Sequence, residues 1–272
     1  MLIYFPLSFN INFEKGDILT RKKRIHTLDE IRGFCVFCMV FDHCLFTHGY
    51  MFGSRTSRNL FDFFEHISPA FAAVFILICG ISCGLSRSNF QRSLKILGAA
   101  LVVSAVTLVI MPEMPIVFGI LHLLGTCVLI YALLGRWISK IPAPVGICLC
   151  LLLFIFTYNV DLENATNGFL GIGPLRLELP ESLYESNNLL ILGFRAPLKA
   201  YSDYFPLLPW AFPFFAGTFL GKFAKEERFP KFMYKARVPF FSTLGTNAFF
   251  VYLVHQPLAY GVFYLISLFG GN

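Results

Sequence analysis

Long apolar runs joined by short polar links make up most of this sequence. Each run has about 17 to 25 residues, the length that an α-helix needs to cross the hydrocarbon core of a bilayer. The runs lie at residues 31–50, 67–86, 94–111, 115–135, 143–159, 205–223 and 240–269. The pattern predicts an all-α integral membrane protein, a bundle of about seven transmembrane helices whose two chain ends lie on opposite faces.

Two places depart from this regular pattern. The last run is longer than one upright span and contains Pro257, so we expect a kink or an interfacial first turn there. The connection of residues 160–204 is much longer than the others, and loops of such length are usually functional or mobile. Its apolar stretch Leu189–Leu192 suits a lid or an interfacial helix that folds back onto the bundle, although a passive surface loop explains it too.

Composition and charge support the same fold class and add a topology. Hydrophobic residues make up 56% of the chain and charged residues only 14%, against about a quarter in soluble domains. The formal charge is +6, but the basic residues are concentrated on alternate polar segments, and cytoplasmic segments carry such an excess. Only five of the 22 Lys and Arg lie on the other segments: Arg55, Arg58, Arg176, Arg195 and Lys199.

This charge distribution places the N-terminus in the cytoplasm, and the C-terminus and the loop 160–204 outside. We therefore expect a multi-pass protein of the cell membrane, with membrane lipids as partners and no nucleic acid. We divide the chain into a basic cytoplasmic segment, residues 1–24, and a single transmembrane domain, residues 25–272. The apolar start precedes the basic run, the reverse of the order in a signal peptide, so we expect it to be retained.

The eight cysteines all fall inside or at the edge of apolar runs. Cys35 and Cys38 have the spacing of a zinc ligand pair, but no second pair lies in a watery loop. Packing as small apolar side chains explains them better. No metal is expected.

Ionisable residues inside an apolar run are costly to bury and are functional candidates by default. The first run and its flank contain Asp29, Arg32, Asp42 and His43. Arg32 and His43 are about three helical turns apart, so they share one face of the helix at a separation of roughly 16 Å along its axis. With Arg32 near the cytoplasmic edge, His43 lies in the outer half of the membrane, within reach of external water.

His43 is our candidate for a catalytic base, because a neutral imidazole can take a proton when a hydroxyl or an amine attacks an acyl group. Asp42 lies about 100° around the helix and is poorly placed to orient the His43 ring. An orienting carboxylate would then come from another segment, with Asp203 as one option. A hydrogen-bonded polar group between helices explains His43 equally well, and an ion pair at the cytoplasmic end is the better explanation of Asp29 and Arg32 from the residues alone.

Other histidines are expected in the outer half of the bundle. His66 starts the second span and could meet His43, although a solvated loop residue explains it somewhat better. His122 opens the fourth span. His255 lies beside Pro257, which leaves a backbone carbonyl without its helical hydrogen bond, so a structural role in capping that carbonyl is the alternative to a catalytic one. The convergence of these histidines, with His48 at the outer end of the first run, is the main indication of an active site.

Several short motifs also resemble a known family. They are Asp29-Glu-Ile-Arg-Gly33 with Met39 and His43, Phe75-Ile-Leu-Ile-Cys-Gly-Ile-Ser82, Gly119-Ile-Leu-His122, Asp203-Tyr-Phe-Pro-Leu-Leu-Pro-Trp210 with Gly217, and Tyr252-Leu-Val-His-Gln-Pro257. Their order across residues 24 to 260 resembles that in bacterial and archaeal membrane proteins similar to the catalytic domain of heparan-α-glucosaminide N-acetyltransferase.

The resemblance implies a transmembrane acyltransferase that uses acetyl-CoA or another acyl-CoA from the cytoplasm. By this analogy His43, with Asp42 and His66 as further catalytic candidates, activates the acceptor, a sugar or glycolipid at the outer face. Arg32 and Asp29 would meet the donor, and His122, Asp203, Trp210 and His255 would line the substrate site. The histidine environment after the first helix departs from the eukaryotic enzyme's, which leaves His48 or His66 open as the working residue.

Two other classes of function compete with acyl transfer. A transporter or flippase would also bury charged residues, but such proteins often show paired repeats with broken helices, and this sequence shows none. A non-catalytic multi-pass protein would tolerate the loss of His43. The acyl group, the acceptor and the oligomeric state, with a homodimer as one option, stay open.

Overall fold

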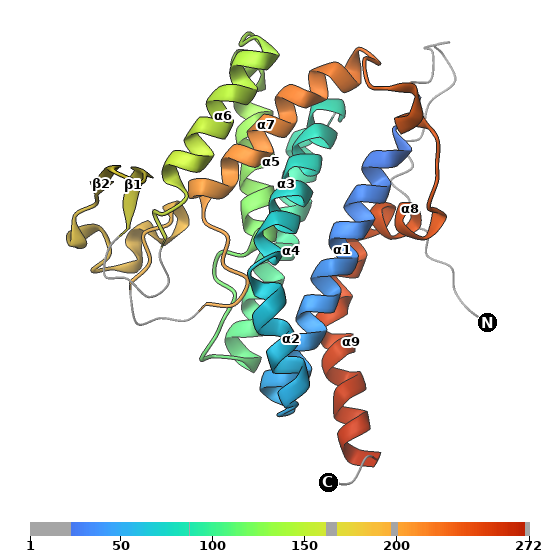
Figure 1. Cartoon of the computed structure of the whole chain (residues 1–272), viewed down its shortest axis with the longest axis vertical. Helices are drawn as coiled ribbons and strands as arrows, with labels where there is room; N and C mark the ends of the chain where they lie inside the picture. The colour runs from blue at the N-terminus through green and yellow to red at the C-terminus, as the bar shows by residue number, and fades with distance from the viewer. Residues whose placement is uncertain (1–22, 87, 162–167, 197–200, 270–272) are drawn as a thin grey trace. The chain divides into compact units, whose positions relative to one another are not determined.

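The structure is a computed structural model that describes residues 23–86, 88–161, 168–196 and 201–269 (Figure 1). The long helices are α1 (His26–Phe46), α3 (Ser68–Leu85), α4 (Asn89–Ile110), α5 (Ile120–Ile138), α6 (Ala143–Thr157), α7 (Leu207–Lys225) and α9 (Ala248–Phe269). A π-helical turn, Thr47–Met51, extends α1, and the shorter helices are α2 (Arg55–Glu65) and α8 (Pro239–Thr246). A hairpin of β1 (Phe169–Ile172) and β2 (Leu175–Glu178) and three 3-10 helices, η2 (Glu181–Leu183), η3 (Asn187–Leu192) and η4 (Lys231–Tyr234), complete the described chain.

The predicted class, an all-α membrane protein, is confirmed. Each of the seven predicted apolar runs is occupied by one of the long helices. Among the described residues, five helices are long and apolar enough to cross a membrane: His26–Met51, α3, α4, α5 and α9. Helix α6 is apolar but has only 15 residues. The count of seven crossings and the sides on which the two ends lie remain predictions.

The last predicted run is divided, but at a different residue from the one expected. Helix α8 ends at Thr246, and Asn247 caps it: the Asn247 backbone N–H donates to the carbonyls of Thr243 and Leu244 at 3.2 Å, and its side-chain amide donates to Thr243 at 2.8 Å. Helix α9 then begins at Ala248 and continues through Pro257. The polar amide of Asn247 therefore ends the first helix, and the proline does not.

The chain forms two compact units. The terminal unit contains the described residues up to Ala72 and those from Pro230 onward, and the central unit contains Ala73–Phe229. Of the predicted N-terminal segment 1–24, only Lys23 and Arg24 belong to the described residues. The boundary at residue 24 therefore remains a prediction.

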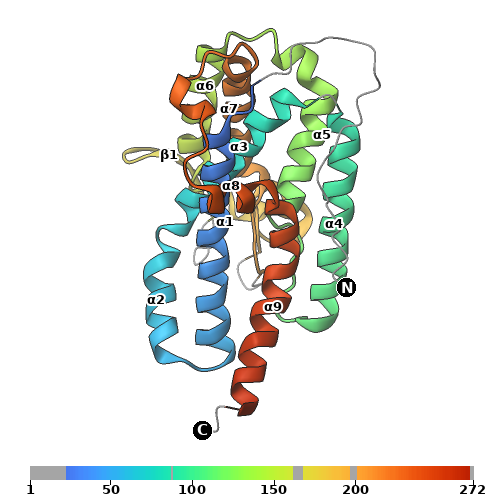
Figure 2. The same cartoon turned by 90° about the vertical axis from the view of Figure 1, so that its right-hand side faces the viewer.

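In the terminal unit, α1 lies against α8, α9 and α2 (Figure 2). Two glycines allow the closest approach, because a Cβ on Gly33 would overlap the backbone of Phe241 and Gly245, and a Cβ on Gly245 would overlap that of Asp29 and Gly33. Small residues at such a crossing let two membrane helices pack backbone to backbone. The segment before α8 is held to α1 as well, since the Glu30 carboxylate accepts the N–H groups of Arg237 at 2.5 Å and Val238 at 2.9 Å.

In the central unit, α4 packs against α5, and α7 packs against both α6 and α5. Glycines again mark a close helix crossing: Gly80 and Gly217 lie so near to each other's helix that a Cβ on either would overlap backbone atoms of α7 or α3. The part of the long connection that the structure describes is folded onto this unit. Its apolar stretch forms η3, which contacts α7 and buries Leu190.

Two polar contacts fix this connection. Arg195 forms an ion pair with Asp161 at 3.2 Å, and its guanidinium lies 5.2 Å from the ring centre of Tyr204. The Tyr204 hydroxyl donates to the Leu190 carbonyl at 2.6 Å. Burial first, and the Asp161 carboxylate second, raise the pKa of Tyr204, so its hydroxyl keeps the proton that this hydrogen bond needs.

The Gly33–Gly245 contact predicts a large effect of one methyl group. Gly33→Ala should lower the free energy of unfolding by about 1 to 3 kcal/mol, because the new Cβ has no room against the α8 backbone. Gly98→Ala makes the same change in α4 where no atom lies within 4 Å, and it should be neutral or stabilising by up to about 1 kcal/mol. Thermal unfolding of both variants in detergent micelles measures the difference, and equal unfolding midpoints would contradict the contact.

Candidate functional site

The central feature of the terminal unit is a pair of imidazoles, His43 on α1 and His255 on α9. Their ring centres are 5.0 Å apart and their planes are inclined by 58°. The His255 Nδ1 lies 2.7 Å from the Tyr252 carbonyl oxygen, so this nitrogen carries the proton and donates it. In the neutral ring Nε2 then holds a lone pair. This atom is buried and has no hydrogen-bond partner among the described residues.

Gln256, the residue after His255, adds a second unpaired polar atom. Its amide nitrogen lies 3.2 Å from the hydroxyl of Thr47, a fully buried residue at the start of the π-helical turn. Its Oε1 is buried and finds no donor in the described part of the chain. Sequence reasoning missed Gln256, although an amide directly after a histidine inside an apolar run was a usable sign.

The two other catalytic candidates of this unit are not brought to His43. Asp42 forms no hydrogen bond with His43 among the described residues, as its 100° offset predicts, and one of its carboxylate oxygens is buried without a partner there. His66 ends α2 as an exposed residue, with its Nδ1 2.8 Å from the Asp62 carbonyl oxygen. His48 is stacked on Phe263 at 4.7 Å and bonded to the Ser57 hydroxyl at 2.8 Å. His255, His66 and His48 are predicted to converge with His43 in this unit. Of these three, His255 is the one whose ring the described structure places against His43.

Asp29 and Arg32 form the ion pair that their spacing predicts. Arg32 Nη1 lies 3.1 Å from Asp29 Oδ1, and Arg24 Nε lies 2.8 Å from the other carboxylate oxygen. Arg32 also reaches the Gly245 carbonyl at 3.5 Å, so it contributes to the contact between α1 and α8. The structural interpretation accounts for both residues, and a role toward the donor remains a prediction.

In the central unit, His122 is bonded at both ring nitrogens. Nδ1 accepts the Gly119 backbone N–H at 3.2 Å, so Nε2 carries the proton and donates to the Ser104 hydroxyl at 3.2 Å. That hydroxyl in turn donates to the Ile116 carbonyl at 2.5 Å. The ring is buried, and this chain of hydrogen bonds holds the loop before α5 in place.

Asp203 lies at the N-terminus of α5 and acts as its cap. Its Oδ2 accepts the backbone N–H of Ile120 at 3.2 Å, which places a negative charge at the positive end of the helix. The close approach requires Gly119, because a Cβ there would overlap Asp203. Trp210, one turn into α7, packs its ring on Phe205 at 5.0 Å and on Phe154 at 6.0 Å.

The predicted site residues are thus divided between the two units. His43, His255, Asp42, His66, Asp29 and Arg32 belong to the terminal unit, and His122, Asp203 and Trp210 belong to the central unit. No group of three or more His, Cys, Asp or Glu able to hold a metal ion occurs within the described residues.

Apolar helices of spanning length, with an imidazole pair between two of them, define a multi-pass membrane protein with a polar site between its helices. Its family is given by the comparison with known families. The chain belongs to the family described as heparan-alpha-glucosaminide N-acetyltransferase, catalytic, whose model matches residues 24–257. The resemblance inferred from the motifs is therefore confirmed, and the chain is a transmembrane acetyltransferase-like protein. No curated protein and no solved structure matches it significantly.

The cap formed by Asp203 predicts a difference between two substitutions. Asp203→Ala should lower the free energy of unfolding by about 1 kcal/mol, because the Ile120 N–H loses its acceptor. Asp203→Asn keeps an acceptor oxygen and tolerates the positive φ of 48° at this residue, so it should stay near the wild type. Unfolding midpoints in micelles check the order, and an Asn variant as unstable as the Ala variant would show that the charge matters more than the cap.

Proposed function

We propose that this protein is a membrane acyltransferase that moves an acetyl or similar acyl group from a cytoplasmic acyl-CoA to an extracytoplasmic sugar or glycolipid. The observation that carries the proposal is the contact of the half-buried His43 with the buried His255, in which the second ring keeps an unpaired lone pair at Nε2. Membership of the acetyltransferase family supports the reaction class. The donor, the acceptor and the cell membrane as the location are parts of the proposal.

The imidazole pair suits general base catalysis in a low-dielectric interior. Two protonated rings with centres 5.0 Å apart would repel each other strongly where water is excluded. At least one ring of the pair is therefore available to accept the proton of the acceptor. His43 is the proposed base, and His255 is the neighbour that we propose contacts the substrate.

The proposed reaction is a direct transfer. His43 takes the proton of the acceptor hydroxyl or amine as that atom attacks the acyl carbonyl of the thioester. The carbon–sulfur bond breaks, and the imidazolium returns the proton to the leaving thiolate, so the pair ends the cycle neutral. The unpaired atoms of His255 and Gln256 are suited to hydrogen-bond the reacting groups.

The remaining site residues enter the proposal through the family resemblance. Arg32, with Asp29, is placed at the donor end of α1, and His122, Asp203 and Trp210 are placed at the acceptor. In the described structure the first two form an ion pair, His122 is fully hydrogen-bonded and Asp203 caps a helix. A substrate role for them therefore requires that they keep these bonds while contacting substrate, or exchange them on binding.

A transporter or flippase is the second candidate, and one observation favours it. Five buried polar atoms among the described residues of the terminal unit have no hydrogen-bond partner there: His26 Nδ1, Asp42 Oδ1, Tyr234 Oη, His255 Nε2 and Gln256 Oε1. Groups of this kind also mark proton and ion pathways in membranes. Covalent transfer of the acyl group separates the two functions, because a carrier leaves its substrate unmodified.

The test uses the purified full-length protein in liposomes, with radiolabelled acetyl-CoA and a cell-envelope extract as the source of acceptor. The wild type should transfer label to glycan or glycolipid. His43→Gln should reduce the rate at least about 100-fold, the usual contribution of a positioned base, while the protein stays folded. Thermal unfolding and size-exclusion chromatography of each variant provide the check of folding.

His66→Gln is the discriminating variant, because it removes an exposed imidazole outside the pair. It should transfer label at about the wild-type rate. A folded His43→Gln variant with full activity would move the base to His66 or His48, and movement of an unmodified compound across the bilayer without labelled product would replace acyl transfer by transport.

A further inference from the structure

The hairpin of β1 and β2 has one face made only of aliphatic side chains. The register pairs Ile172 with Leu175 and Leu170 with Leu177. Residues directly opposite each other share a face of the sheet, and so do residues two apart along a strand, so these four side chains lie on the same face. The opposite face holds Phe169, Gly171, Arg176 and Glu178. The hairpin is therefore amphipathic.

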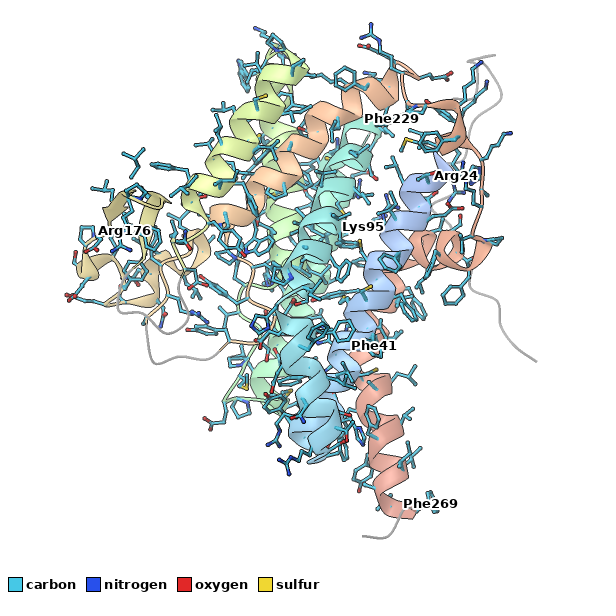
Figure 3. All side chains as sticks on the ribbon, viewed as in Figure 1. Arg24, Phe41, Lys95, Arg176, Phe229 and Phe269 are labelled. Carbon is cyan, nitrogen blue, oxygen red and sulfur yellow. The ribbon has the colours of Figure 1, made fainter. Side chains whose placement is uncertain are left out.

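The aliphatic face is not covered by the rest of the described chain. Ile172 is 60% exposed, Leu175 83% and Leu177 65%. On the polar face, Arg176 forms an ion pair with Glu178 at 3.8 Å and lies 5.5 Å from the ring centre of Phe169. Figure 3 labels Arg176 on this hairpin. Three exposed aliphatic side chains side by side need an apolar partner to be stable in this position.

The hairpin is held at the C-terminal end of α6. The Phe169 N–H donates to the Asn159 carbonyl at 3.0 Å, and the Tyr184 hydroxyl donates to the Val160 carbonyl at 2.6 Å. Gly168 fits against the same carbonyl, because a Cβ there would overlap it. In Figure 1 the two strands extend sideways from the end of α6. The depth of α6 in the membrane therefore sets the depth of the hairpin.

The polar residues Asn159 and Asp161 follow α6 directly, and Asp161 pairs with Arg195 at 3.2 Å. Because charged groups are costly in the hydrocarbon core, we place this end of α6 at the level of the headgroups. The outer surface of α6 is apolar and exposed near that end, with Leu152 at 66%, Ile155 at 46% and Phe156 at 45%. These residues form an exposed apolar surface, and the hairpin lies beside this end of α6, which β1 contacts.

We propose that the β1–β2 hairpin is an interfacial anchor whose aliphatic face rests on the phospholipids of the same bilayer, beside the end of α6. The two strands have free edges, and unpaired backbone groups are not tolerated in the hydrocarbon core. The backbone therefore stays among the headgroups while Ile172, Leu175 and Leu177 reach the outermost part of the acyl chains. Arg176 and Glu178 face the water and the lipid phosphates. This anchor does not depend on the proposed acyl transfer.

Tryptophan fluorescence in liposomes tests the anchor. A single tryptophan is placed in turn at two neighbouring positions of β2 that lie on opposite faces of the hairpin. Leu177→Trp and Glu178→Trp are made in a Trp137→Phe, Trp210→Phe background, which removes both native tryptophans. The quenchers are phosphatidylcholine brominated in the upper acyl chain and iodide in the buffer. The Leu177→Trp fluorescence should be quenched by the brominated lipid at least about twofold more than that of Glu178→Trp, and iodide should give the reverse order.

Two outcomes would overturn the proposal. Equal quenching of both variants by iodide would place the aliphatic face in water. Protection of the tryptophan at position 177 from both quenchers would show that protein covers this face, another part of the chain or a second copy.

If the tryptophan-free background does not fold, a photoactivatable benzoyl-phenylalanine at position 177 of the otherwise wild-type chain gives the same decision. Adducts with phospholipid support the anchor, and adducts with protein alone, or none, exclude it.

Discussion

The absence of water in the hydrocarbon core is the constraint on which this structure depends. A polar group placed there must find its partner inside the protein or remain costly. Most of the polar side chains that the sequence places in apolar runs satisfy this rule: Glu30 accepts two backbone N–H groups, Arg32 pairs with Asp29, and His122 uses both ring nitrogens. The exceptions among the described residues are His26, Asp42, Tyr234, His255 and Gln256. Two of them, His255 and Gln256, are adjacent on α9 and contact His43 and Thr47, which sets the imidazole pair apart from the structural polar contacts.

The helical fold could be predicted because its cause is local in the sequence. A run of apolar residues long enough to cross a bilayer has no stable alternative to a helix in lipid. All seven runs are accordingly helical in the structure, the last of them as two helices, α8 and α9. The division of the last run could not be placed in the same way. Pro257 is tolerated within α9, while the side-chain amide of Asn247 ends α8, and this bond depends on the backbone geometry of the turn.

The candidate site was predictable only in part, because spacing along one helix gives no contacts between helices. The sequence identified His43 and His255 separately, but their meeting depends on how α9 packs against α1. His66 is a residue for which position along the chain was misleading. Its position at the outer end of a span suggested a contact with His43, yet it is exposed and bonded only to the preceding turn of α2. The motif residues His122 and Asp203 likewise have structural roles that spacing did not reveal, and the bond of Asp203 to Ile120 joins residues far apart in the chain.

The motif Asp29-Glu-Ile-Arg-Gly33 has a structural role that bears on the site. Asp29 and Arg32 form an ion pair whose arginine reaches the Gly245 carbonyl, Glu30 binds the segment before α8, and Gly33 admits the α8 backbone. The contacts of Arg32, Glu30 and Gly33 hold α8 and the segment before it on α1. Because Asn247 alone separates α8 from α9, they also limit where α9 can begin, and hence where His255 lies relative to His43. A donor-binding role for Arg32 is therefore not needed to explain why these residues occur together at the start of the helix that carries the proposed base.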